Sequence, residues 1–206
     1  MRKRIHLITL ALKRCRIYVL TIFLTYWISC IAGIWMSHTG NDFALLTRDK
    51  LVGHAMQTDQ ASIKYQQGNN LSAALIDFGA NLFMGAVPQT IMGLGIVIPY
   101  CSAAVQGWVG GIVSVDSAHK SRLTGFKSAF YYFFVLLLQF IPYSLAIGAG
   151  IKSGVDFYIN NKIQGWRIWD FRIQKESLID LGCVYLLVVP LFFIASCFEF
   201  FSTWNI

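Results

Sequence analysis

Charged side chains are scarce in this sequence. Of its 206 residues, 13% are charged and 56% are hydrophobic, whereas about a quarter of the residues of an ordinary soluble domain are charged. The charges lie in short segments between long uncharged runs, and the mean hydropathy is +0.56. This distribution excludes a water-soluble globular fold and is typical of an integral membrane protein.

Patterns that would mark a catalytic or metal site are also lacking. The four histidines are scattered without ligand spacing, and the five cysteines contain no Cys-x-x-Cys pair. No Ser, Cys or His stands in a local nucleophile motif. Gly93-Leu94-Gly95 lacks the Lys-Ser or Lys-Thr end of a phosphate-binding loop. We therefore expect no enzyme, no metal and no cofactor.

Basic residues exceed acidic ones, 17 against 10, which gives a net charge of +7. The cations flank the apolar runs and form no continuous face, as a nucleic-acid-binding surface would. Retention on the cytoplasmic side and contact with anionic lipid account for them, so we expect the lipid bilayer and no nucleic acid as a partner.

The uncharged runs predict an all-α protein with five membrane-spanning helices in one domain, residues 1–206. The first run, residues 17–36, contains 20 uncharged residues. At about 1.5 Å per residue it is long enough for a hydrocarbon core of about 30 Å. The predicted spans are 17–36, 72–93, 95–115, 129–151 and 178–200, with an outer loop at 37–71 and an interfacial cytoplasmic segment at 152–177.

The middle of the chain predicts a tight helical hairpin. Residues 72–115 contain a single charge, Asp77, and are too long for one span. The break between the two helices is marked by Pro88, Gly93, Gly95 and Pro99. An alternative is one crossing followed by a re-entrant loop.

Lys and Arg residues set the expected orientation, because they are retained on the cytoplasmic side. Five crossings with the amino terminus inside place eleven basic residues inside and six outside, whereas the re-entrant alternative divides them nine to eight. The first arrangement predicts a protein of the bacterial inner membrane with a cytoplasmic amino terminus. It also places the basic 116–128 loop outside, although basic loops are usually retained inside. The sequence therefore does not decide on which side of the membrane this loop lies.

Small residues recur every fourth position in two of the spans. In lipid, helices associate through close backbone contact, which small residues permit. We therefore expect helix-packing faces, within the chain or in a homo-oligomer. The two stripes are Ala103, Gly107 and Gly111, and Ala146, Gly150 and Gly154.

A few polar residues lie inside the predicted spans and are candidates for function. A charged side chain at a helix centre costs about 2.5 to 3.5 kcal/mol on insertion scales. Asp77 lies at the start of a span, where the helix dipole favours it, but Glu199 lies at a carboxyl end, where the dipole does not. The candidates are Asp77, Asn81, Gln106 and Glu199.

Asp77 and Asp180 stand in similar pentapeptides, LIDFG and LIDLG. An intramembrane aspartyl hydrolase would need both carboxylates at one depth. The five-span arrangement places them near opposite faces of the membrane and therefore favours two structural residues, or the trace of an inverted repeat.

Two extramembrane segments can hold partners. The 37–71 loop has the spacing of one or two short helices and is either a docking surface or a solvated loop. In the second segment, Trp166, Arg167, Trp169 and Phe171 alternate rings with charges, which is typical of the headgroup region. A sharper alternative is a coupling helix for a cytoplasmic ATPase.

The hairpin sequence FGANLFMGAVPQTIMGLGIVIPYCSAAVQGWVGG resembles the central signature of the stage II sporulation protein M family. The likeness rests on Asn81, the Gly93–Gly95 turn, Pro99 and Gln106-Gly107, and the closing FFIASCFEFFST adds Glu199. The chain departs from the family in its fourth span, which lacks the Pro-His-Gly followed by Glu. The resemblance implies a five-span bacterial inner-membrane protein whose founding member works with peptidoglycan-degrading partners.

Two functions follow as hypotheses. The leading one is a non-enzymatic scaffold or assembly subunit of a cell-envelope complex, which binds other membrane or envelope proteins. The alternative is a transporter or permease subunit, driven by a cytoplasmic ATPase or an ion gradient, with Asp77 or Glu199 in contact with the cargo.

Overall fold

The computed structural model describes residues 2–164 and 174–202, and in this part of the chain the regular structure is helical, with one isolated β-bridge between Val115 and Ser121. The prediction of an all-helical fold is therefore confirmed. The elements are α1 (Arg2–His38), α2 (Asp42–Thr58), α3 (Gln60–Gln66), α4 (Asn70–Gly79), the π-helix η1 (Ala80–Ala86), α5 (Val87–Met92), the 3₁₀ turn η2 (Gly93–Gly95), α6 (Ile98–Ile112), α7 (Phe126–Gln164) and α8 (Lys175–Phe201).

Four helical stretches in the described residues are long and apolar enough to cross a membrane. They are Ile5–His38, Asn70–Gly95, Phe126–Asn160 and Lys175–Phe201. Each contains one predicted span. The remaining predicted span, 95–115, corresponds to α6, whose 15 residues fall short of that length. The fold is thus compatible with a multi-pass membrane protein.

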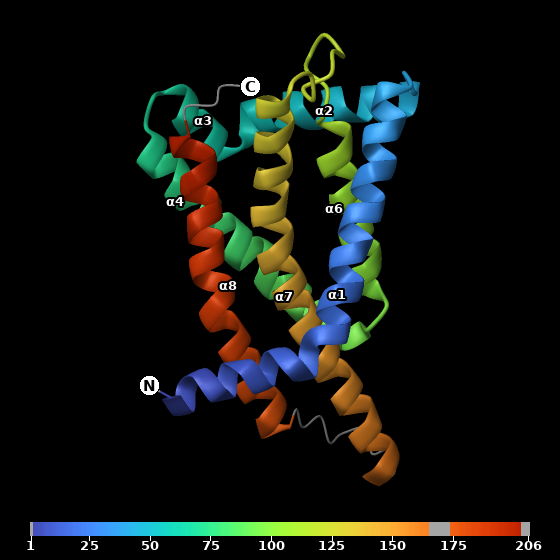
Figure 1. Cartoon of the computed structure of the whole chain (residues 1–206), viewed down its shortest axis with the longest axis vertical. Coiled ribbons are helices and arrows are strands. Elements are labelled where there is room, and N and C mark those ends of the chain that lie inside the picture. Colours follow the sequence, from blue (N-terminus) through green and yellow to red (C-terminus); the bar gives the residue numbers. More distant parts are fainter. Residues whose placement is uncertain (1, 165–173, 203–206) are drawn as a thin grey trace.

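Helices α1, α6, α7 and α8 stand side by side as a bundle, whereas α2 lies across one end of it (Figure 1). The first part of α1 lies across the other end. We call these the α2 end and the amino-terminal end. The α4–α5 segment descends obliquely from the α2 end, and α6 returns toward that end beside α1 (Figure 1).

Helix α7 is the centre of the bundle. In an 18-residue apolar segment of α7, 61% of the residues are buried, against 28% or less in the corresponding segments of the other three long stretches. It contributes Ala146 and Ala149 to one core cluster, together with Phe192 of α8. It contributes Phe140 and Ile147 to a second cluster with α1 and α6. Helix α8 on one side and helices α1 and α6 on the other are therefore packed against α7.

The first stripe of small residues packs against α1. A Cβ at Gly107 would lie 2.4 Å from the carbonyl oxygen of Tyr26, and one at Gly111 would lie 2.1 Å from that of Cys30. Ala103 is completely buried in the same contact region. These distances leave no room for a side chain, so the two backbones are in direct contact.

The second stripe packs against the α4–α5 segment and not against the first stripe. A Cβ at Gly150 would lie 2.3 Å from the carbonyl oxygen of Thr90, and one at Gly154 would lie 2.7 Å from that of Gly93. Ala146 accepts a hydrogen bond from Thr90 through its carbonyl group, at 3.1 Å. Both stripes are therefore used inside the chain.

The predicted hairpin break lies where the structure changes direction. Pro88 is in the first turn of α5, Pro99 is in the first turn of α6, and Gly93–Gly95 forms the 3₁₀ turn η2 between them. At Pro99 the helix begins, and there the missing N–H of proline has no partner to lose, whereas Pro88 follows the π-helix η1 with no break in the helical backbone.

Candidate functional site

A cavity of about 720 Å³ lies near the α2 end of the bundle, walled by α4, α7 and α8 and bordered by α2, α3 and the connection after α6. Sites for small molecules typically measure about 300 to 1,000 Å³. The polar residues of its wall include two carboxylic acids, two amides and one guanidinium: Asp77, Glu199, Asn81, Gln139 and Arg122.

Asp77 is held in position by three neighbours from three elements. Ser196 of α8 donates a hydrogen bond to its Oδ2 at 2.6 Å, and the Asn81 amide donates to the same oxygen at 2.9 Å. The Tyr143 hydroxyl of α7 donates to Oδ1 of Asn81 at 2.8 Å. Among the described residues no hydrogen bond reaches Oδ1 of Asp77, which leaves this oxygen available to a ligand.

Glu199 lies at the end of α8, on the same cavity. The Gln139 amide of α7 donates to its Oε2 at 3.2 Å. The other end of that amide, Oε1 of Gln139, is buried and has no partner. No described cation forms an ion pair with Glu199 or with Asp77, so within the described residues only hydrogen bonds offset the cost of either charge.

A π-helix separates the two parts of the α4–α5 segment at Ala80–Ala86, and it begins three residues after Asp77. Within it, Gly85 lies so close to Tyr143 that a Cβ would be 2.3 Å from the tyrosine oxygen. π-Helical turns are rare and often occur at functional sites. Sequence analysis did not find this feature, for which the only local signal was the pair of glycines, Gly79 and Gly85, in one span.

The cavity has a positive edge near α2. Arg122 lines the cavity, and its pKa is lowered by burial and by the nearby charge of Arg48. Arg48 is only 3% exposed and donates to Asp49 at 2.9 Å, and Asp49 also pairs with His119. The Nε atoms of both arginines are buried without a partner.

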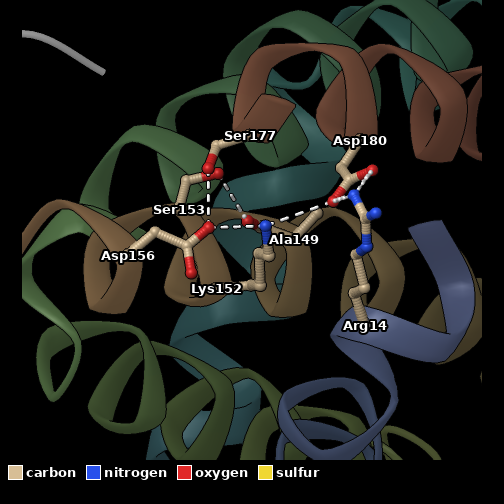
Figure 2. A network of polar contacts seen from close by, with 7 residues as sticks. All are labelled: Arg14, Ala149, Lys152, Ser153, Asp156, Ser177 and Asp180. Carbon is tan, nitrogen blue, oxygen red and sulfur yellow. Dashed lines mark hydrogen bonds and ion pairs between the residues drawn. The ribbon is translucent and has the colours of Figure 1, made fainter. Parts of the chain in front are cut away.

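A second polar cluster closes the amino-terminal end of the bundle (Figure 2). Asp180 of α8 accepts hydrogen bonds from Arg14 of α1 at 3.2 Å and from Lys152 of α7 at 3.1 Å. Lys152 also pairs with Asp156 at 2.5 Å, and Ser177 donates to Asp156 at 2.6 Å. This ionic network ties three helices together, and sequence analysis missed the parts played by Lys152 and Asp156.

The structure brings three of the four predicted polar residues together. Asp77, Asn81 and Glu199 share the cavity, whereas Gln106 accepts a hydrogen bond from the Tyr26 hydroxyl at 2.7 Å between α6 and α1. The predicted docking residues Trp166, Arg167, Trp169 and Phe171 lie outside the described residues.

Asp77 and Asp180 are far apart. Asp77 contacts Ser196, which follows Asp180 by 16 residues on the same helix, a distance of about 24 Å at 1.5 Å per residue. This separation excludes the aspartyl-hydrolase geometry, in which both carboxylates share a proton.

Comparison with known proteins gave no match to a protein family, a curated protein or a solved structure. The resemblance to the stage II sporulation protein M family therefore stays a prediction.

Proposed function

We propose that the chain is a non-enzymatic transport subunit whose cavity binds a small solute that carries a positive charge. One observation supports this above all: Asp77 and Glu199 face one cavity of about 720 Å³, and neither has an ion-pair partner among the described residues. Acidic groups inside a membrane domain are costly, and they typically mark substrate or ion pathways.

The same observations favour transport over the scaffold hypothesis. The scaffold hypothesis drew partly on the stripes of small residues, which were expected to pack within the chain or against a second copy of it. Both stripes pack within the chain, at Gly107 and Gly111 against α1 and at Gly150 and Gly154 against the α4–α5 segment. They therefore offer no free face to a partner.

We further propose that α6 is a fifth crossing. It runs parallel to α1, with Tyr100 bonded to Thr21 at 2.7 Å near one end and Ser114 bonded to Ser37 at 3.3 Å near the other. The paired part of α1 runs over 17 residues, from Thr21 to Ser37, and its ends lie about 24 Å apart. This is most of the span predicted at 17–36.

Labelling of single cysteines tests this arrangement. With five crossings and a cytoplasmic amino terminus, Thr124→Cys reacts with an impermeant maleimide from outside the cell. Lys175→Cys, just before the last crossing, reacts only after the membrane is permeabilised. Labelling of Thr124→Cys only after permeabilisation, together with labelling of Lys175→Cys from outside, would contradict the five-span arrangement.

In this orientation the cavity opens to the outside of the inner membrane, and the ionic network faces the cytoplasm. The network and the contacts of Gly150 and Gly154 seal the end of the bundle opposite the cavity. An open site on one side and a sealed end on the other is the arrangement of one state of an alternating-access transporter.

Binding of an organic cation tests the proposed function. We would measure thermal shifts of the protein in nanodiscs with the dipeptide amide phenylalanyl-alaninamide, and then uptake of the labelled amide into proteoliposomes. Asp77→Asn and Glu199→Gln should each weaken binding by tenfold or more, because a hydrogen bond to a charged group is among the stronger polar contacts. Asp116→Asn is the matched control, since Asp116 lies outside the cavity wall. Unchanged binding in both cavity variants, or no binding and no uptake by the wild type, would refute the proposal.

One observation supports the scaffold function as a second candidate. Helix α2 lies across the end of the bundle, and its Phe43, Leu46 and Met56 are each more than half exposed. Phe43 and Leu46 lie one turn apart, and such an exposed apolar pair suits a docking partner in the cell envelope. Crosslinking in native membranes followed by mass spectrometry separates the two functions: envelope hydrolases captured on α2 support the scaffold, and a captured cytoplasmic ATPase supports an energised permease.

A further inference from the structure

The cavity carries charges of both signs, in different parts of its wall. The carboxylates are on the helices, Asp77 on α4 and Glu199 on α8, whereas Arg122 is on the connection between α6 and α7. Among the described residues no ion pair joins Arg122 to either carboxylate. The wall therefore has two separate charged sites instead of one neutralised pair.

The positive site lacks a partner for part of its hydrogen-bonding capacity. Nε of Arg122 is buried without an acceptor, and so is Nε of Arg48 behind it. Burial and the charge of Arg48 also lower the pKa of Arg122. The rest of the guanidinium is accessible and makes no hydrogen bond or ion pair with the described residues, so an anionic group of a ligand would supply its partner.

The negative site, formed by Asp77 and Glu199, has oxygen atoms that lack a hydrogen-bond donor. Oδ1 of Asp77 accepts no hydrogen bond from the described residues, and neither does Oε1 of Glu199, since Gln139 donates to Oε2. A primary ammonium group has three donors and no acceptor, which fits such a cluster of oxygens.

We propose that the cavity recognises a zwitterion, a small molecule with a primary ammonium group at one end and a carboxylate at the other. The ammonium group binds between Asp77 and Glu199, and the carboxylate binds Arg122. The rings of Tyr132 and Phe200 in the same wall cover the apolar body between the two charges. This inference rests on the proposed function and adds the second charge of the substrate.

Three forms of one dipeptide test the inference. Phenylalanyl-alanine has both charges, its carboxyl amide retains only the ammonium group, and its N-acetyl form retains only the carboxylate. Affinities are measured by calorimetry on the full chain in nanodiscs. We expect the free dipeptide to bind about tenfold or more tightly than either derivative, since each derivative leaves one charged site unpaired.

Variants of Arg122 assign the preference for the carboxylate. Arg122→Gln should bring the affinity for the free dipeptide down to that for the amide, and Arg122→Lys should keep part of the preference. Lys120→Gln is the control, since Lys120 is an exposed cation of the same connection and lies outside the cavity wall. If Arg122→Gln fails to fold, the comparison of the three ligands on the wild type still decides the matter.

The outcomes separate this inference from the proposed function. If the amide binds as tightly as the free dipeptide and both depend on Asp77, the zwitterion is refuted but the cation site stands. If no form of the dipeptide binds, both are refuted. A preference for the free dipeptide that persists in Arg122→Gln also refutes the role assigned to Arg122.

Discussion

Replacing Asp180 with asparagine removes the centre of the ionic network and should open the amino-terminal end of the bundle. Asp180 is 5% exposed and is the acceptor shared by Arg14 of α1 and Lys152 of α7 (Figure 2). Asparagine has nearly the same shape but no charge. The helices then lose the attraction that holds α8 against the other two.

The size of the effect follows from the exposure of the partners. The Arg14 side chain is 46% exposed, so solvent screens its pair with Asp180 and that pair contributes little. The Lys152 side chain is 12% exposed, and breaking a buried pair costs about 3–5 kcal/mol. Lys152 keeps Asp156 as a partner, which reduces the cost to about 2 kcal/mol, or about a 30-fold change in an equilibrium constant.

Cys15 is a natural reporter of this opening, because it is completely buried beside Arg14 and in the same core cluster as Val184 of α8. In a chain that retains Cys15 as its only cysteine, we expect Asp180→Asn to raise the rate of maleimide labelling about 30-fold when closing is faster than labelling.

Asp42→Asn is the control for this experiment, since Asp42 is an exposed carboxylate in the first turn of α2, at the other end of the bundle. An unchanged labelling rate in a folded Asp180→Asn variant would refute the assignment of the network as a closure.

Two further predictions concern packing and pH. Gly111→Ala should destabilise the protein by about 2 kcal/mol or more, because the added methyl group would collide with the backbone at Cys30. Gly182→Ala is the control, since Gly182 has open space around it. The stabilities of the two variants are compared by thermal unfolding in detergent. The pKa of Asp49 lies below its ordinary 3.8, because Arg48 and then His119 donate hydrogen bonds to it. The contribution of Asp49 to stability is therefore complete above pH 3.8 and is lost as the pH falls through the lower pKa of the folded state. Hydrogen exchange of α2, measured against pH, should show this transition. The Asp49→Asn variant should not show it.

Much of the helical arrangement was predictable because uncharged length is a local property. The long apolar stretches contain the predicted spans 17–36, 129–151 and 178–200. The ends of the helices were not predictable in the same way. Helix α1 begins at Arg2 and α7 continues to Gln164, since charged residues can continue a helix beyond the membrane and hydropathy reports only the crossing.

The cavity was predictable only in part. The cost of a charge in lipid singled out Asp77 and Glu199 from the sequence alone. Their shared cavity depends on α4 and α8 lying side by side, which no local pattern specifies. The role of Arg122 was missed for the same reason, because a basic residue in a polar connection has the sequence context of a solvated side chain.

The cavity and the ionic network are linked because the same two helices contribute to both. Helix α7 carries Gln139 toward the cavity and Lys152 into the network, and α8 carries Glu199 and Asp180 in the same way. Between these positions each helix contains one proline, Pro142 in α7 and Pro190 in α8. Proline removes a backbone hydrogen bond and is a common point of helix bending.

Bending at these two points would allow the network to open while the cavity closes. A ligand that binds the open cavity must then stabilise the closed network. By linkage, closing the network strengthens ligand binding by the same factor by which the ligand favours the closed network. Ligand should therefore slow the labelling of Cys15 by the factor by which an open network weakens ligand binding. Labelling that is insensitive to a bound ligand would mean that the two ends of the bundle move independently, and that the cavity is a binding site without a transport cycle.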